Sequence, residues 1–164
     1  MKTAIIYYSL EGNTKAAAQK ISDLTGADIY EIIMHKSIPS DSGAKFFKGG
    51  MQAVFGICPP LKNFKFDENK YDRIILGTPV WAGKPASPIN TLLRLIKDKN
   101  KITAVFTLSG SGNNKGCIAK LNKKCHSIKH TVSLADKANK DLSGQNSQKL
   151  NEFIRSVNGD NKNG

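Results

Sequence analysis

Apolar runs alternate with helix-like patterns along most of this chain, and this alternation limits the possible folds more than any other feature. Runs suited to strands occupy Thr3–Tyr8, Asp28–Met34, Arg73–Thr78 and Ile102–Leu108, with a fifth inside Ser127–Leu134. They are nearly continuous and rich in β-branched residues, as expected of parallel strands buried on both faces. The sequence therefore predicts an α/β protein with a doubly wound, five-stranded parallel sheet in the order 2-1-3-4-5 and helices on both faces.

Helical periodicity fills the segments between these runs. The first helix is predicted from Thr14 to about Thr25, ending before Gly26 and burying Ala17, Ile21 and Leu24. Ser87 and Pro88 predict the N-cap and first position of another helix, with Ile89, Leu92, Leu93 and Ile96 on its apolar face. Two more are predicted at about Lys115–Lys123 and at the C-terminus, the latter burying Leu150, Phe153, Ile154 and Val157. A short helix before the third strand would pack Phe46, Phe47, Met51, Val54 and Phe55 against the core.

Length and cysteine content favour a single domain in a reducing compartment. The chain has 164 residues, of which 39% are hydrophobic, and we place one domain at residues 1–157 with a frayed tail at 158–164. Three cysteines without a repeated spacing do not predict a disulfide framework. No signal peptide or membrane span is predicted, so the expected location is the cytoplasm and no membrane partner is expected.

The chain is strongly basic, with a formal net charge of +12, and this suggests acidic partners. Its lysines are scattered singly or in pairs, which favours a solvated basic surface over a nucleic-acid site. Cys125, His126 and His130 do not have the spacing of a zinc site, and alternation along a strand would put Cys125 on the face opposite the histidines. No metal ligand and no acid–base catalytic residue is assigned.

The turn after the first strand has the composition of an anion site. Gly12 permits a tight turn, and the helix that follows opens with unpaired backbone N–H groups at its positive dipole end. Ser9, Asn13 and Thr14 add side-chain donors, while the lysine of a nucleoside triphosphate loop is missing, so a monophosphate is favoured. Simple helix capping by the same residues is the alternative.

Two further loops fall on the same edge of the predicted sheet. Trp81 lies in the loop after the third strand, where an aromatic ring suits stacking on a planar heterocycle or, alternatively, docking of a partner. The loop after the fourth strand contains Gly110 and Gly112, which allow its backbone N–H groups to approach a ligand. These glycines do not form a dinucleotide fingerprint, which argues against bound NAD.

These three segments resemble the short-chain flavodoxin family, carriers of one FMN, over residues 1 to about 157. The resemblance implies a flavodoxin-like fold, with the phosphate held by Ser9 to Thr14, the isoalloxazine ring stacked on Trp81, and the backbone of Ala82 and Gly83 near flavin N5. The third loop would border the pyrimidine edge. The cofactor-binding residues implied are Ser9, Leu10, Glu11, Gly12, Asn13, Thr14, Thr78, Pro79, Val80, Trp81, Ala82, Gly83, Ser109, Gly110, Ser111 and Gly112. Glu11 departs from the family pattern, which has a hydroxyl at this position.

The resemblance implies an electron carrier that shuttles single electrons between redox partners, as a monomer or weak dimer. Its basic charge predicts that it meets the acidic surfaces of those partners and that its flavin potential is higher than in acidic members. One alternative is an NAD(P)H-dependent flavin or quinone reductase on the same fold, with Lys84 receiving a nucleotide phosphate. Another is a flavin-free binding or scaffold module that uses the basic surface.

Overall fold

The structure is a computed structural model that describes residues 1–36, 49–136 and 143–159. Its strands are β1 (Thr3–Tyr8), β2 (Asp28–Ile32), β3 (Arg73–Trp81), β4 (Lys84–Pro85), β5 (Ile102–Ser109) and β6 (His130–Ala135). Its helices are α1 (Asn13–Thr25), α3 (Ser87–Leu95), α4 (Lys115–Asn122) and α6 (Asn146–Gly159), with 3-10 turns at Glu68–Lys70 and Lys99–Lys101. Residues 49–54 are also helical. No helix in the described ranges is long and apolar enough to cross a membrane.

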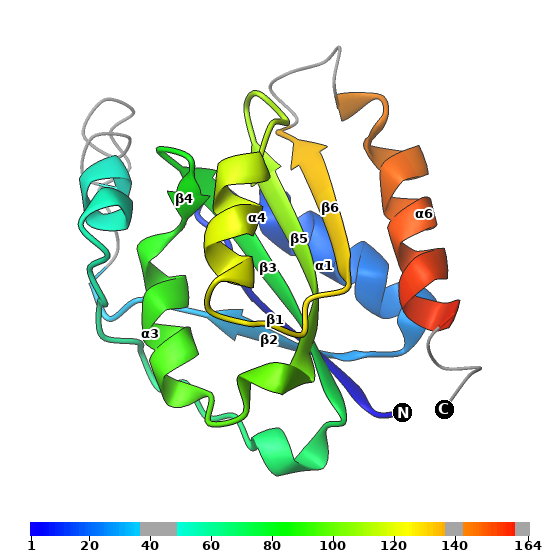
Figure 1. The fold of residues 1–164 in the computed structure, drawn as a ribbon, viewed down its shortest axis with the longest axis horizontal. Helices are drawn as coiled ribbons and strands as arrows, with labels where there is room; N and C mark the ends of the chain where they lie inside the picture. The colour runs from blue at the N-terminus through cyan, green and yellow to red at the C-terminus, as the bar shows by residue number, and fades with distance from the viewer. Residues whose placement is uncertain (37–48, 137–142, 160–164) are drawn as a thin grey trace.

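The sheet has the predicted parallel order, with one additional strand. The order is β2-β1-β3-β5-β6, and each neighbouring pair is parallel (Figure 1). The doubly wound fold is therefore confirmed. The sixth strand, β4, is antiparallel to β3 and forms a hairpin in which Trp81 pairs with Lys84. Two residues are too few to show a sequence pattern, so β4 was not predicted.

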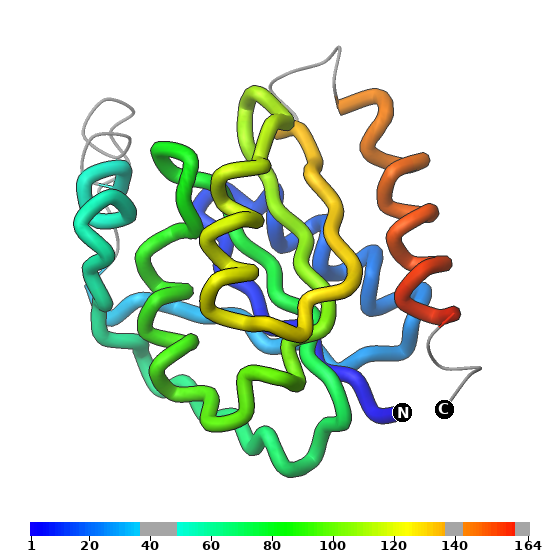
Figure 2. Tube along the Cα trace, in the orientation of Figure 1, coloured from blue at the N-terminus to red at the C-terminus, as the bar shows by residue number. Residues whose placement is uncertain are grey.

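Two apolar layers cover the sheet, one on each face. α1 and α6 enclose a core that includes Ile5, Ile21 and Phe106, and α3 and α4 enclose the other, which includes Ile74 and Leu92. Figure 2 traces the chain from an N-terminus at one end of the sheet to the loops after β1, β3 and β5 at the other. The loops after β1, β3 and β5 therefore lie together at the carboxyl-terminal edge of the sheet.

Several predicted details of the elements are wrong. Leu24 is 53% exposed, because Thr14, Ala17, Ala18 and Ile21 form the buried face of α1. Ala86, not Ser87, is the N-cap of α3, which moves Pro88 one position further into the first turn. Strand β3 continues through Pro79 to Trp81, because pairing with β1 already stops at Gly77 and the missing N–H of proline removes no bond to that strand. Helix α6 continues to Gly159 and so includes the first two residues of the predicted tail, while residues 160–164 lie outside the described ranges.

The predicted core role of the short helix before β3 is also wrong where it can be checked. Met51, Val54 and Phe55 are 43%, 45% and 71% exposed, while Phe46 and Phe47 lie outside the described residues. The small residue Ala53 is fully buried instead. This helix therefore buries Ala53 and exposes its larger apolar side chains Met51 and Val54, and Phe55 just after it is exposed as well.

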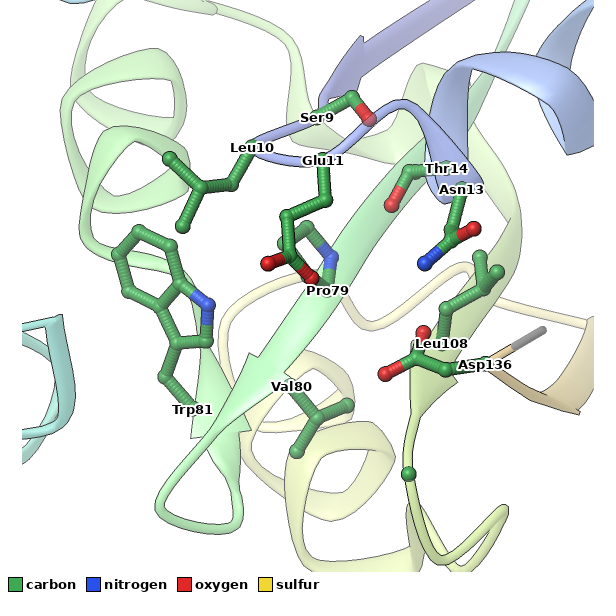
Figure 3. Close-up of a pocket in the computed structure, with 11 residues that line it drawn as sticks. Ser9, Leu10, Glu11, Asn13, Thr14, Pro79, Val80, Trp81, Leu108 and Asp136 are labelled. Atoms are coloured by element: carbon green, nitrogen blue, oxygen red, sulfur yellow. The ribbon is translucent and has the colours of Figure 1, made fainter. Parts of the chain in front are cut away.

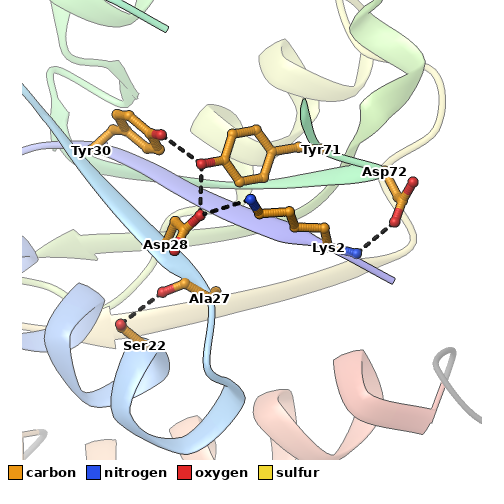
Figure 4. A network of polar contacts seen from close by, with 7 residues as sticks. All are labelled: Lys2, Ser22, Ala27, Asp28, Tyr30, Tyr71 and Asp72. Atoms are coloured by element: carbon orange, nitrogen blue, oxygen red, sulfur yellow. Dashed lines mark hydrogen bonds and ion pairs between the residues drawn. The ribbon is translucent and has the colours of Figure 1, made fainter. Parts of the chain in front are cut away.

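A polar network ties together the sheet end opposite the three loops (Figure 4). The Tyr71 hydroxyl shares a hydrogen bond of 2.5 Å with that of Tyr30 and donates to Asp28 at 2.7 Å, and Lys2 lies 3.7 Å from the same carboxylate. Burial, the hydrogen bond to Tyr30 and the one to Asp28 raise the pKa of Tyr71, so its phenol stays neutral. The buried Arg73 donates to Thr3 at 2.8 Å and to the carbonyl of Val157 at 2.7 Å. These contacts connect β1, β2, β3 and α6 at the sheet end that lies away from the three loops.

Candidate functional site

A pocket lies at the carboxyl ends of the parallel strands, over the point between β1 and β3 where the winding direction changes (Figure 3). It is lined by Ser9, Leu10, Glu11, Asn13, Thr14, Pro79, Val80, Trp81, Leu108, Gly110 and Asp136. Nine of the predicted site residues are among them. The three predicted loops therefore meet at one pocket, together with the residue that follows β6.

The first loop presents an open helix terminus to this pocket. Gly12 has a φ of 86°, its N–H donates to the Ser9 hydroxyl at 3.1 Å, and no side chain within the described residues caps α1. Thr14 is almost fully buried in the first turn and lines the pocket with Asn13. Ser9 thus closes the turn, but the backbone N–H groups of the first helical turn are not occupied by a capping side chain. This favours the anion site over simple capping.

Two carboxylates enter the same pocket. Figure 3 shows Glu11 reaching from the first loop toward Pro79, and Asp136 beside Leu108. Burial raises the pKa of Asp136, and the charge of Glu11 raises it further. Asp136 was missed from the sequence, although its position after the last strand of a parallel sheet was a usable signal.

Trp81 forms a wall of the pocket as the last residue of β3, not in the loop after this strand as predicted. It is half-buried, and the ring of Tyr8 meets it edge-to-face with the centroids 5.6 Å apart. Burial raises the pKa of Tyr8 to about 12, so this neighbouring ring is uncharged. On another side Gly49 lies so close that an added Cβ would be 3.3 Å from the indole. The indole is therefore held firmly by protein and still contributes to the pocket.

The apex of the second loop is formed by Ala82 and Gly83, whose φ values are 48° and 72°. Two successive residues with positive φ between paired strands are typical of a type I′ hairpin turn. Both are exposed and lie outside the pocket lining. Thr78 is also outside it: its buried hydroxyl donates to the Pro79 carbonyl at 2.8 Å and accepts from the N–H of Ala86 at 3.1 Å. Its role in this structure is to join β3 to the start of α3.

The third loop is shaped by a buried polar chain beneath it. The Ser109 hydroxyl donates to Asn114 at 2.5 Å, and Asn114 donates to Thr107 at 2.9 Å. Gly112 has a φ of 64°, and its N–H donates to the Ser109 carbonyl at 3.2 Å. Gly110 lines the pocket, whereas Ser109, Ser111 and Gly112 do not. The predicted third loop thus reaches the pocket by its glycine backbone.

The donor set fits a phosphate ester beside a flat apolar group. Hydroxyl and amide groups from Ser9, Asn13 and Thr14 lie with the N-terminus of α1, while Leu10 and Trp81 supply apolar surface. All three cysteines are free, and no group of three metal-binding side chains gathers in the described residues. The pocket is thus suited to an organic phosphate with a planar ring.

The fold and this pocket define a doubly wound α/β protein of the flavodoxin-like class. The chain belongs to the flavodoxin family, since the family model described as flavodoxin matches residues 2–153. The resemblance seen in the sequence is therefore confirmed. No curated protein matches the sequence.

Solved structures agree with this assignment. The flavoprotein of Lactobacillus acidophilus NCFM in complex with FMN is 29% identical, with a TM-score of 0.64 over 85% of this chain and 96% of that one. Its apo form is 30% identical, with a TM-score of 0.57 over 85% and 95%. A flavoprotein of Bacteroides uniformis ATCC 8492 is 22% identical, with a TM-score of 0.73 over 89% and 97%, and supports the fold alone.

Proposed function

We propose that this protein binds one FMN in the pocket and carries single electrons between redox partners. The observation that carries the proposal is that the uncapped N-terminus of α1 and the indole of Trp81 border the same pocket. This pocket lies between β1 and β3, where the winding direction of the sheet changes. Family membership and the FMN complex of the Lactobacillus acidophilus flavoprotein support the choice of cofactor. When bound, FMN supplies the capacity to accept and release electrons one at a time.

The phosphate is assigned to the first loop. Ser9, Asn13 and Thr14 would donate to it together with the first backbone N–H groups of α1. Because the phosphate sits at the positive end of a helix of 13 residues, no lysine is needed to hold it. Glu11 opposes this arrangement electrostatically and would have to turn its carboxylate away from the phosphate.

The ring system is assigned to the space beside Trp81. The indole would cover one part of the isoalloxazine and exclude water from it, and the backbone at Gly110 would face its pyrimidine edge. The exposed hairpin at Ala82 and Gly83 would meet the ring near N5. Its peptide groups, not a titrating side chain, would then contact the atom that changes protonation.

The binding proposal can be tested by titrating apoprotein with FMN and with riboflavin, following flavin fluorescence. We expect riboflavin to bind at least about tenfold more weakly, because it lacks the phosphate. Ser9→Ala with Thr14→Val should weaken FMN and leave riboflavin nearly unchanged, whereas Trp81→Leu should weaken both. Equal affinity for the two flavins would contradict the phosphate assignment.

A second experiment separates the carrier role from the reductase alternative. The observation that favours a reductase is that Lys84, which would receive the nucleotide phosphate, pairs with Trp81 in the hairpin. The FMN-loaded protein would be mixed anaerobically with NADPH and, separately, with stepwise dithionite, while visible spectra are recorded. A carrier is reduced by dithionite and stays oxidised with NADPH. Rapid reduction by NADPH alone would identify a reductase, and a protein that never takes up flavin would leave the scaffold alternative.

A further inference from the structure

Three lysines lie within electrostatic reach on the β3–β4 hairpin and on and just after α4. Lys84 belongs to β4, Lys120 to α4, and Lys124 follows α4. Burial lowers the pKa of Lys120, and the nearby charges of Lys84 and Lys124 lower it further. Gly116, in the first turn of α4, lies so close to the hairpin that an added Cβ would be 3.1 Å from the Gly83 carbonyl. The start of α4 is therefore packed against the hairpin that carries Lys84.

No carboxylate neutralises these lysines within the described residues. The ion pairs found there are Lys2 with Asp28 and Lys15 with Glu31, both on other parts of the molecule. The Lys124 ammonium donates to the Asn90 amide oxygen at 3.1 Å, which carries no charge. Repulsion between neighbouring ammonium groups raises the free energy of the protein, and a carboxylate placed among them would remove this cost.

The positive surface continues along the α3–α4 face. A hollow beside Asn90 is lined by Lys124, Arg94 and Lys99. α3 and α4 cover the same face of the sheet (Figure 1), and Lys124 belongs both to this hollow and to the three lysines described above. The positive charges thus extend from the hairpin along this face. We call this set the basic strip: Lys84, Arg94, Lys99, Lys120 and Lys124.

Exposed apolar side chains border the hairpin on its other side. Met51, Val54, Phe55 and Ile57 are 43–71% exposed, and we call them the apolar flank. Gly49 and Gly50, which precede them, lie against Trp81 and Ala82, and the Ile57 carbonyl accepts from Asn90 at 3.2 Å. Hairpin, apolar flank and basic strip thus adjoin one another, and we call the three together the hairpin face. Apolar residues next to a charged border are the composition of a protein interface, not of a groove that follows a nucleic-acid backbone.

We propose that this face docks an acidic electron-transfer protein. The inference rests on the proposed function, because docking here would set the partner's redox centre against the hairpin beside the flavin. Carboxylates of the partner would lie on the basic strip, and its apolar contacts would fall on the flank. Attraction between such charges mainly raises the association rate, which suits a carrier that must bind and leave quickly.

The test compares two FMN-loaded variants with the same loss of charge. Lys84→Gln/Lys120→Gln/Lys124→Gln removes three charges from the basic strip, and Lys20→Gln/Lys149→Gln/Arg155→Gln removes three from α1 and α6 on the opposite face. A plant-type [2Fe–2S] ferredoxin, reduced beforehand, serves as the acidic probe. The second-order rate of electron transfer is measured by stopped flow from roughly 20 to 500 mM salt.

We expect the strip variant to react about tenfold more slowly at low salt with a flatter salt dependence, and the control to stay within about twofold of the wild type. Amide chemical shifts of the ¹⁵N-labelled protein with the same ferredoxin should change around the hairpin and α4. Phe55→Ser should slow the reaction at high salt, where the charges are screened.

Equal slowing in both triple variants would overturn the proposal, because net charge alone would then explain the rates. Shift changes confined to α1 and α6, or tighter binding of duplex DNA than of ferredoxin at the same lysines, would overturn it as well. FMN affinity of every variant is measured first. If all variants bind FMN normally and the strip variant transfers electrons as fast as the wild type, the docking face alone is refuted. If the wild type binds no FMN, the proposed function is refuted.

Discussion

Glu11 and Asp136 bring carboxylates into one pocket from distant parts of the chain, and the charge of Glu11 adds to burial in raising the pKa of Asp136. The chain as a whole has a net charge of +12, which predicts a favourable field for an anionic flavin. The two carboxylates oppose that field from within the pocket, where the distances are shortest. The local charges therefore argue against the rise in potential that the net charge predicts.

Replacing Glu11 by glutamine removes the negative charge nearest the proposed phosphate site. We expect FMN to bind about two- to fivefold more tightly, the range being modest because Glu11 is exposed and its charge is screened. Fluorescence titration gives the dissociation constant, and riboflavin should respond less because it carries no phosphate. Glu152→Gln on α6 is the matched control and should leave both constants unchanged. Weaker FMN binding by Glu11→Gln would mean that the carboxylate is a favourable contact.

Asp136 should make stability fall with rising pH. Its folded pKa lies above the ordinary value of 3.8, so the folded state holds this proton more tightly than the unfolded state does. The free energy of unfolding then decreases as pH rises from about 4 through the folded pKa, and the loss is complete above it. Asp136→Asn should be more stable than the wild type at pH 7, with the difference shrinking toward zero as pH falls to 3.8.

Urea unfolding at a series of pH values measures this difference directly. Asp23→Asn on the exposed side of α1 changes charge equally and serves as the control. Because its side chain is exposed, its replacement should change the free energy of unfolding by less than about 0.5 kcal/mol. A difference for Asp136→Asn that is the same at all pH values would show that its carboxyl does not titrate abnormally.

The five buried parallel strands were predictable from their long β-branched runs, and their order from the alternation with helices and the anion-binding turn after the first strand. Ile74, Ile75 and Leu76 are fully buried, as a continuous apolar run in a central strand requires. The extent of a strand, in contrast, depends on its partner. The pairing of Ala135 with Ser109 carries β6 past the predicted run, and this is what delivers Asp136 to the pocket.

The site was predictable as three loops on one edge, but not in its finer arrangement. Periodicity shows which residues share a helix face, and it does not show which face turns inward. In the helix at residues 49–54 the inward side is set by close contact of Gly49 with Trp81 and by the hydrogen bond of Gln52 with Ser87 at 2.9 Å. Both contacts join distant segments, so Phe55 could be placed only from the structure.

Ala82 occupies a backbone conformation that suits asparagine or glycine better. At a φ of 48° its side chain crowds the backbone, and asparagine is favoured at the first central position of a type I′ turn. Ala82→Asn should raise the free energy of unfolding by about 0.5–1 kcal/mol, whereas Gly83→Ala should lower it by about 1 kcal/mol, because Gly83 has a φ of 72°. Thermal and urea unfolding of the two apoprotein variants would check the opposite signs. A loss of stability in Ala82→Asn would show that the alanine methyl group makes a contact worth more than the strain.

Gly77 should tolerate no side chain, because the ring of Phe106 fills the space beside it. An added Cβ would lie 2.2 Å from the ring, and Phe106 is fully buried in the core under α1 and α6. We expect Gly77→Ala to lower the free energy of unfolding by about 3 kcal/mol or more. Adding Phe106→Leu should recover at least about 1 kcal/mol of that loss, although Phe106→Leu alone destabilises the protein.

A double-mutant cycle measured by urea unfolding distinguishes the clash between Gly77→Ala and Phe106 from a general destabilisation of β3 by any side chain at residue 77. Gly159→Ala, at the last described residue of α6, meets nothing within 4 Å among the described residues and should change stability by less than about 0.5 kcal/mol. Strictly additive losses in the Gly77 and Phe106 pair would contradict the close approach, because an alanine that clashes with the ring must be relieved when the ring becomes smaller. A favourable coupling in the cycle would establish that Gly77 is glycine in order to admit Phe106, which packs the centre of the sheet beneath the pocket.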